Sequence, residues 1–213
     1  MQYTQIDLET WPRRNFFNHF IQDVRCVVSL TCDVDVTGLV AFRKTSNHRF
    51  YPTMLYLLAK TLNGRDEFKA GYDEAGNIII WDSLSPSYVV FHPEDEQFTR
   101  LITEYAPDYD IFYGRVVSDM ALHRDKRGFE VPFTARNIFD ASCIPWISYR
   151  SLDLHVFDTG AYLAPVVTWG KYQEDNGRWL MPLSLQIHHA VADGFHIARF
   201  FSELQSEIYA FAP

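Results

Sequence analysis

Residues 183–196 read Leu183-Ser184-Leu185-Gln186-Ile187-His188-His189-Ala190-Val191-Ala192-Asp193-Gly194-Phe195-His196. The apolar run that ends in two histidines is typical of a buried strand, and Asp193-Gly194 is typical of a turn. From Phe195 onward, apolar residues keep helical spacing at Ile197, Phe200, Phe201, Leu204, Ile208 and Phe211. The pattern therefore predicts a strand over 179–189, a turn, and a C-terminal amphipathic helix.

The rest of the chain mixes strand and helix patterns. Strands are expected over 24–34, 68–72, 78–81, 88–92, 97–102, 142–149, 152–157 and 166–172, and helices over 35–47, 52–63 and 110–124. Turn residues at 73–77 and 175–177 favour two hairpins. The sequence contains no internal repeat, no low-complexity linker and no Gly-rich phosphate loop. We expect a single domain over residues 1–213, an α/β (α+β) two-layer sandwich whose mixed, largely antiparallel sheet is covered by helices.

Composition and charge narrow the functional classes. The 213 residues carry a net charge of −8, which argues against a nucleic-acid or anionic-membrane partner. The odd set Cys26, Cys32 and Cys143 has no CxxC pair, so it indicates neither a disulfide framework nor a zinc knuckle. Met1 to Trp11 lacks the apolar core of a signal peptide, and no apolar run is long enough to span a membrane. We expect a cytoplasmic protein.

The aromatic fraction of 16% leaves two interpretations open. Aromatic side chains in such number can form an interface or an apolar pocket, or they can simply fill a core rich in phenylalanine.

The histidines of the quoted stretch raise the question of a metal site. His188, His189, His196 and Asp193 lie within nine residues, which could suggest zinc. Successive side chains on a strand point to opposite faces, so His188 and His189 cannot readily share one ion, and the spacing is not HExxH. We expect no metal.

Acid–base chemistry is the second possibility for the same histidines. A histidine with an unperturbed pKa of about 6.5 can take up a proton and return it near neutral pH. The alternative from the residues alone is that both histidines are satisfied polar groups at the end of a sheet.

The run His188-His189-Ala190-Val191-Ala192-Asp193-Gly194 resembles the HHxxxDG signature of the CoA-dependent acyltransferases, which include the chloramphenicol acetyltransferases and the catalytic domains of dihydrolipoamide acyltransferases. Further segments resemble the chloramphenicol acetyltransferase family, in the same order and at nearly the same separations. They are Trp11-Pro12-Arg13-Arg14, Phe50-Tyr51-Pro52, Ile80-Trp81-Asp82, Ser142-Cys143-Ile144-Pro145-Trp146, Ala164-Pro165-Val166-Val167-Thr168, Lys171-Tyr172 and Pro182-Leu183-Ser184-Leu185-Gln186. The resemblance covers essentially the whole chain.

This resemblance implies a chloramphenicol acetyltransferase-like fold and transfer of an acetyl group from acetyl-CoA to a hydroxyl of chloramphenicol. His189 matches the family's general base, Ser142 its oxyanion donor, and Thr168 the threonine that contacts the intermediate through water. Asp193 matches a structural aspartate that pairs with an arginine, here Arg13. His188 and His196 are expected to be structural.

The resemblance also implies binding residues and an assembly. Coenzyme A is expected at Tyr51, Tyr172, Lys171 and Arg49. The acceptor pocket maps to Phe20, Val24, Cys26, Val28, Phe98, Phe129, Leu152, Leu154 and Val156, all apolar or soft as an aromatic substrate requires. The family forms homotrimers whose active sites lie between subunits. Phe20 replaces a substrate-binding tyrosine of some relatives, Val28 replaces a larger side chain, and Ala192 replaces a cysteine common inside the motif.

Two other functions remain as alternatives. The same mechanism can serve another hydroxyl or thiol acceptor, or the chain can be a non-catalytic binder of small hydrophobic drugs. The joint presence of His189, Ser142 and Thr168 argues against the binder, which has no use for a base or an oxyanion donor.

Overall fold

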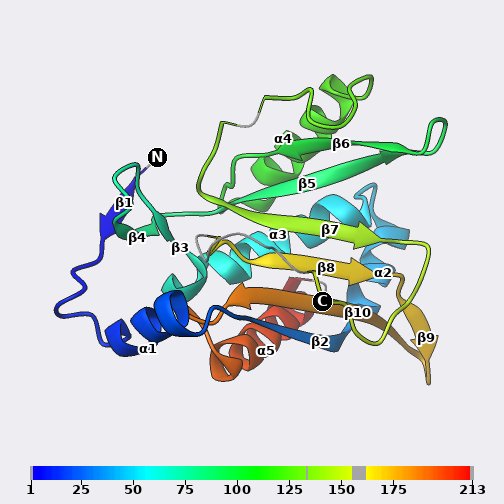
Figure 1. Ribbon diagram of the computed structural model, residues 1–213. Coiled ribbons are helices and arrows are strands. Elements are labelled where there is room, and N and C mark those ends of the chain that lie inside the picture. The colour runs from blue at the N-terminus through cyan, green and yellow to red at the C-terminus, as the bar shows by residue number, and fades with distance from the viewer. Residues whose placement is uncertain (1, 133, 155–161, 212–213) are drawn as a thin grey trace.

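The computed structural model describes residues 2–132, 134–154 and 162–211, and its centre is a seven-stranded sheet (Figure 1). The strands run in the order β2-β10-β8-β7-β5-β6, and β9 pairs with β10. Their bounds are β2 Val27–Asp35, β5 Ser85–His92, β6 Gln97–Ile102, β7 Ile138–Ile144, β8 Val166–Gly170, β9 Gln173–Asp175 and β10 Arg178–His188. A small second sheet has the order β1-β4-β3, with β1 Tyr3–Gln5, β3 Ala70–Tyr72 and β4 Ile78–Trp81.

The main sheet is mixed. β10 pairs antiparallel with β2, β8 and β9, and β5 pairs antiparallel with β6, whereas β7 is parallel to both β5 and β8. The predicted mixed, largely antiparallel sheet is therefore confirmed.

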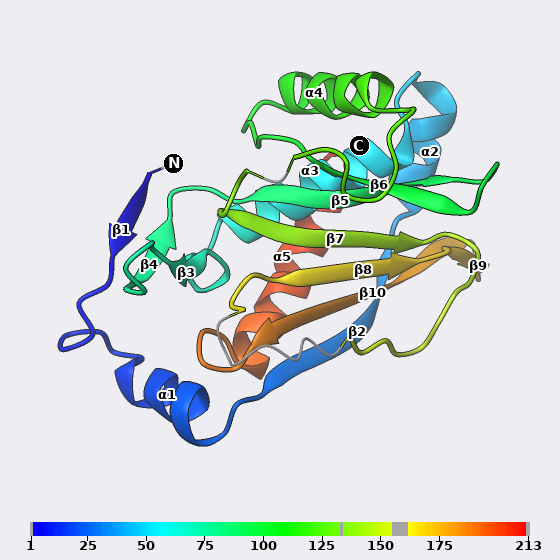
Figure 2. The same cartoon turned by 45° about the horizontal axis from the view of Figure 1, so that its top comes forward.

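Helices cover one face of this sheet, as Figures 1 and 2 show for α2, α3 and α5. The helices are α1 Arg14–Asn18 with a π-helical turn over His19–Asp23, α2 Thr37–Thr45, α3 Phe50–Asn63, a 3-10 turn at Asp66–Phe68, α4 Tyr109–Leu122 and α5 Gly194–Phe211. α3 contacts both α4 and α5, and it is buried along nearly its whole length. The predicted two-layer arrangement of sheet and helices is confirmed.

Strand β10 lies at the centre of the core. Its alternate residues Met181, Leu183, Leu185 and Ile187 are at most 1% exposed and belong to the same apolar cluster as the buried residues of α3 and α5. Burial of each such side chain stabilises the fold by roughly 1.5–3 kcal/mol. Because strand side chains alternate, Ser184, Gln186 and His188 face the other side of the sheet.

That other face is polar, and the segment after β7 lies across it. Leu152 accepts a hydrogen bond from Ser29 Oγ at 3.1 Å through its carbonyl oxygen, and the amide of Leu154 donates to Gln186 Oε1 at 3.0 Å. Side chains of β2 and β10 thus take the backbone hydrogen bonds that a neighbouring strand would take. The prediction of a strand over 152–157 is wrong for 152–154, and 155–157 lie outside the described residues.

Most other predicted elements are confirmed with shifted ends. The helix predicted from Pro52 begins at Phe50 and ends at Asn63, before Gly64. The strand predicted over 142–149 spans Ile138–Ile144 instead, because Pro145 follows and cannot donate to a ladder. The hairpin at 175–177 turns through positive φ at Asn176 and Gly177, as a tight turn of this kind requires. β1, α1 and β9 were not predicted.

None of the helices in the described part of the chain is long and apolar enough to cross a membrane.

Candidate active site

His189 directly follows β10, and its half-buried ring is held on two sides. The ring stacks on Phe20 with centroids 4.0 Å apart, and Nδ1 lies 3.0 Å from the carbonyl oxygen of Ala192. Its backbone amide donates to the carbonyl oxygen of Cys26 at 3.0 Å. Because a carbonyl oxygen only accepts, Nδ1 must carry the proton, which leaves the lone pair of a neutral ring on Nε2.

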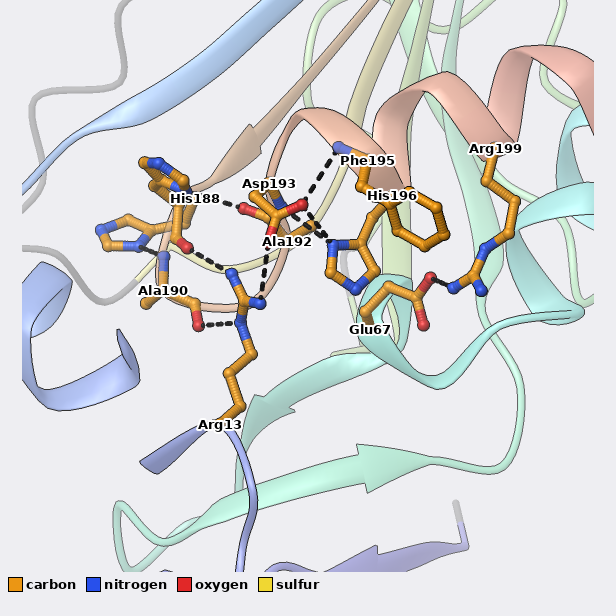
Figure 3. A network of polar contacts seen from close by, with 10 residues as sticks. Arg13, Glu67, His188, Ala190, Ala192, Asp193, Phe195, His196 and Arg199 are labelled. Carbon is orange, nitrogen blue, oxygen red and sulfur yellow. Dashed lines mark hydrogen bonds and ion pairs between the residues drawn. The ribbon is translucent and has the colours of Figure 1, made fainter. Parts of the chain in front are cut away.

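A single arginine clamps the turn after His189 (Figure 3). Arg13 Nη2 donates to the His189 carbonyl oxygen at 3.0 Å, and Nε donates to the Ala190 carbonyl oxygen at 2.8 Å. Arg13 Nη1 pairs with Asp193 Oδ2 at 3.2 Å. The structure therefore places the two residues that were matched to a structural pair in direct contact.

The Asp193 carboxylate is surrounded by donors. Oδ1 accepts from the amide of Phe195 at 3.0 Å and lies 2.9 Å from His196 Nδ1. Burial acts to raise the pKa of Asp193, but the hydrogen bond from Arg13 and the charge and hydrogen bond of His196 outweigh it and lower the pKa below its usual value. The carboxylate is ionised at neutral pH.

Ser142 and Thr168 occupy neighbouring strands in one row across the sheet. Ser142 of β7 is opposite Thr168 of β8, which is opposite Ser184 of β10. Tyr149 connects two residues of this row, because its hydroxyl donates to the Thr168 carbonyl oxygen at 2.6 Å and accepts from Ser184 Oγ at 3.3 Å. Ser142 is half-buried and is one of the residues that line a cleft.

This cleft has a volume of about 810 Å³, and its mainly apolar lining includes three cations and the carboxylate of Glu96. All four residues matched to coenzyme binding line it: Tyr51, Tyr172, Lys171 and Arg49.

Two further lining residues, Arg43 and Trp146, were not assigned from the sequence. Arg43 donates to the Tyr172 hydroxyl at 3.2 Å, and Trp146 is 62% exposed. The only sequence signal for Arg43 is its place in the last turn of a helix, and that turn does not indicate which cleft it borders.

Cys143 lies beside Ser142 in the lining of the cleft. Burial raises the pKa of its thiol to about 12. The thiol is therefore protonated at neutral pH and does not compete as a nucleophile.

The apolar candidates form separate groups. Phe20 lies on the π-helical turn and stacks on His189, and Cys26, which follows that turn, accepts from the His189 amide. Val24 lies between the turn and β2, and Val28 lies on β2 opposite Ile187. Phe98 lines the cleft and packs edge-to-face on Phe129, with ring centroids 5.9 Å apart.

The last three candidates lie on the segment after β7. Leu152 and Leu154 bond to side chains on the polar face of the sheet, as described above, and Val156 lies outside the described residues.

One chain does not bring the base and the cleft together. Thr168 is level with Ser184, and His189 lies five residues further along the direction of β10, a separation of about 17 Å at 3.4 Å per residue. Figure 1 shows the same arrangement, because β10 ends on the side of α1 whereas β7 and β8 end on the side of β9. His189 with its apolar neighbours, at the end of β10, and Ser142 with its cleft, level with the middle of β10, are two separate half-sites.

The part of the chain that the structure describes contains no group of three or more His, Cys, Asp or Glu side chains that could hold a metal ion. His188 is buried, and its Nδ1 accepts from the amide of Ala190 at 3.2 Å.

Comparison with known proteins identifies the family. The family model described as chloramphenicol acetyltransferase matches residues 1–205. A chloramphenicol acetyltransferase of Clostridium perfringens is 37% identical over 207 residues, covering 96% of this chain and 94% of the relative. Chloramphenicol acetyltransferase 3 of Escherichia coli is 39% identical over 206 residues, covering 96% of each chain.

Solved structures agree on the fold. A structure titled chloramphenicol acetyltransferase superposes with a TM-score of 0.86 at 23% identity, covering 97% of this chain and 100% of the other. A dihydrolipoamide acetyltransferase of Azotobacter vinelandii superposes with a TM-score of 0.65 at 17% identity, covering 87% and 82%. On the whole-length sequence match, this chain belongs to the chloramphenicol acetyltransferase family.

Proposed function

We propose that this protein is an acyltransferase that moves the acetyl group of acetyl-CoA onto a hydroxyl of chloramphenicol, with His189 as general base. Family membership over the whole chain supports the reaction. The observation that carries the role of His189 is the contact of its Nδ1 with the Ala192 carbonyl oxygen, because it leaves Nε2 as the basic atom.

In the proposed reaction, Nε2 of His189 takes the proton of the acceptor hydroxyl as its oxygen attacks the thioester carbonyl. Such positioned proton transfer contributes about 10²–10⁴-fold to the rate. Ser142 donates its hydroxyl hydrogen to the oxyanion of the tetrahedral intermediate, and Thr168, one strand away, holds a water beside it. The protonated His189 then returns its proton to the departing thiolate of coenzyme A.

The cleft beside Ser142 suits the coenzyme. Tyr51 and Tyr172 supply flat apolar surfaces for the adenine, and Arg43, Arg49 and Lys171 supply cations for its phosphates. Tyr51 is anchored by a hydrogen bond from its hydroxyl to the Val89 carbonyl oxygen at 3.0 Å, so its ring is in place before the ligand arrives.

We further propose that residues 1–213 act as one domain and that the active site is completed between subunits of a homotrimer. The separation of the two half-sites supports this, because base and oxyanion donor must lie within a few ångströms of one substrate. Two different patches that meet between identical chains form a heterologous contact, which closes into a ring when the rotation between the chains allows it. Val24, Val27 and Leu30 beside the His189 half-site, and Phe98 and Phe129 beside the other, are exposed apolar side chains of the kind that such a contact buries.

A direct assay tests the reaction. Purified protein is mixed with acetyl-CoA and chloramphenicol, and thiol release is followed with a colorimetric thiol reagent. Release is expected to require chloramphenicol and to fall by at least about 10²-fold in His189→Ala. His123→Ala, at the end of α4, is the matched control and should keep wild-type turnover.

Each outcome of this assay is informative. Thiol release with other hydroxyl or thiol acceptors, but not with chloramphenicol, would show that the acceptor is a different molecule. Binding of chloramphenicol without thiol release would indicate a non-catalytic drug binder. Full activity in His189→Ala would refute the assignment of the base.

Subunit complementation tests the shared site. His189→Ala and Ser142→Ala chains, each inactive alone, are co-expressed with different affinity tags and purified as mixed oligomers. If each site takes its base from one chain and its oxyanion donor from the next, about one quarter of the sites in a random mixture regain both groups. No recovery in a verified mixed oligomer, or a mass by light scattering other than three times that of the 24.9 kDa chain, would contradict the proposal.

A further inference from the structure

One peptide group lies between two histidines. The carbonyl oxygen of Ala192 accepts from His189 Nδ1 at 3.0 Å, and the amide nitrogen of Asp193, the other end of the same peptide group, lies 3.2 Å from His196 Nδ1. Because a peptide group is planar and its C=O and N–H point in opposite directions, fixing the N–H end also fixes the C=O end. The orientation of the acceptor that holds the His189 ring is therefore tied to the position of His196.

His196 has a partner on Asp193 in either state of its Nδ1. With a proton, Nδ1 donates to Asp193 Oδ1 at 2.9 Å, and without one it accepts from the Asp193 amide. The two contacts are made by one nitrogen atom to the two ends of one residue. His196 therefore bonds to the Asp193 carboxylate when Nδ1 is protonated, and to the N–H of the Ala192–Asp193 peptide group when Nδ1 is not.

The surroundings favour a fixed ring. His196 belongs to the first turn of α5, its side chain is 22% exposed, and the Phe195 ring packs edge-on against it with centroids 5.6 Å apart. The ion pair between Glu67 and Arg199 lies beyond Phe195 (Figure 3), and the Arg199 guanidinium lies over the Phe195 ring. His196 is thus held between Asp193 and a braced aromatic ring.

The other residues of the turn are placed by packing. Ala190, Val191 and Ala192 are at most 1% exposed, so the core holds their side chains. Asp193 is held instead by polar contacts with Arg13 Nη1, the Phe195 amide and His196 Nδ1.

We propose that His196 is a positioning residue for the general base. It holds the Ala192–Asp193 peptide group so that the Ala192 carbonyl oxygen keeps the proton of His189 on Nδ1 and the lone pair on Nε2. This inference rests on the proposed function of His189. It assigns no proton transfer to His196 itself.

Substitutions of His196 by side chains of different length test the proposal. In His196→Asn the side-chain amide occupies the place of Nδ1 and can still bond to Asp193, whereas in His196→Gln the amide reaches the place of Nε2 instead. We expect kcat to fall by about 10- to 100-fold in His196→Gln and in His196→Ala, with little change in the KM values, and to recover in His196→Asn. Phe195→Ala removes the ring that packs against His196 but leaves these hydrogen bonds in place, so its kcat should fall less than that of His196→Gln.

A spectroscopic readout separates positioning from general stability and does not require turnover. In protein labelled with ¹⁵N-histidine, the nitrogen shifts and couplings of His189 report which ring nitrogen carries the proton. The wild type and His196→Asn should show a protonated Nδ1, and His196→Gln should show a mixture of tautomers.

The outcomes can be told apart. An unchanged His189 tautomer together with unchanged kcat in His196→Gln would overturn the proposal, as would an equal loss of kcat in His196→Asn and His196→Gln. If the wild type itself shows no acetyl transfer, the proposed function fails, while the tautomer of His189 still decides whether His196 positions it.

Discussion

Replacement of Asp193 by asparagine tests the clamp that holds His189 without changing side-chain volume. Two donors meet at this carboxylate, Arg13 Nη1 at Oδ2 and the Phe195 amide at Oδ1, and His196 Nδ1 lies 2.9 Å from Oδ1. An asparagine has one acceptor oxygen and one donor group, so at least one of these donors must face another donor. The orientation that keeps both Oδ1 contacts turns the new amide group toward Arg13 and loses the ion pair.

The size of the effect follows from these contacts. A hydrogen bond to a charged group contributes about 1.5–3 kcal/mol when buried. The Asp193 side chain is 36% exposed, and solvent screening reduces the loss to about 1 kcal/mol. In a chain of this size that corresponds to a fall in Tm of about 2–4 °C. The effect on kcat should be larger, about 10- to 100-fold, because a small displacement of His189 weakens proton transfer.

Asp95→Asn provides the matched control. Asp95 Oδ2 pairs with Arg127 Nε at 2.6 Å, and its side chain is 37% exposed, close to the value for Asp193. Asp95 lies in the turn between β5 and β6, where it has no contact with His189. Both variants are compared by thermal unfolding and by thiol release at saturating substrates. Wild-type kcat in Asp193→Asn, or an equal loss of kcat in Asp95→Asn, would refute the reasoning.

Three further predictions follow from the site. The lowered pKa of Asp193 means that its ion pair stabilises the fold above the unfolded pKa of about 3.9 and that this stabilisation is lost as the pH falls through the lower folded value. The Tm difference between the wild type and Asp193→Asn should therefore shrink as the pH falls below about 5 and vanish in stronger acid, and a constant difference at all pH values would contradict this. Because the Ser142 hydroxyl is proposed to stabilise the oxyanion, Ser142→Ala should lower kcat by about 10²–10³-fold with little change in the KM values. Steady-state kinetics measures both quantities. In Gly170→Ala the added Cβ would lie 2.9 Å from the Ile147 carbonyl oxygen and from Tyr149 Cε1, so residue 170, which lines the cleft, would have to shift. We therefore expect a higher KM for acetyl-CoA. An unchanged KM and Tm would show that the added methyl group fits without this shift.

Local patterns predicted the regular elements well wherever apolar periodicity was strong. β10 and α5 follow directly from the alternation and the helical spacing around the paired histidines, and α3 follows from Pro52 and its leucines. The segment after β7 was misassigned because its alternation resembles a strand. Its backbone groups bond to Ser29 and Gln186, two side chains far away in sequence.

The site residues divide in the same way. The motif from His188 to Gly194 predicted where the base would stand, since a turn of adjacent residues is a local structure. Arg43 was not found, because its role at the cleft depends on the hydrogen bond to Tyr172, a residue 129 positions away.

By itself, the sequence determined that an apolar strand delivers one histidine to a turn, because alternation and turn chemistry act between neighbouring residues. Only the tertiary structure decided that Arg13 would reach the carbonyl oxygen of a residue 176 positions later, and that His189 and Ser142 would lie about 17 Å apart along the sheet. Those outcomes depend on strand order and register, which are set by how whole elements pack together and not by any short run of residues.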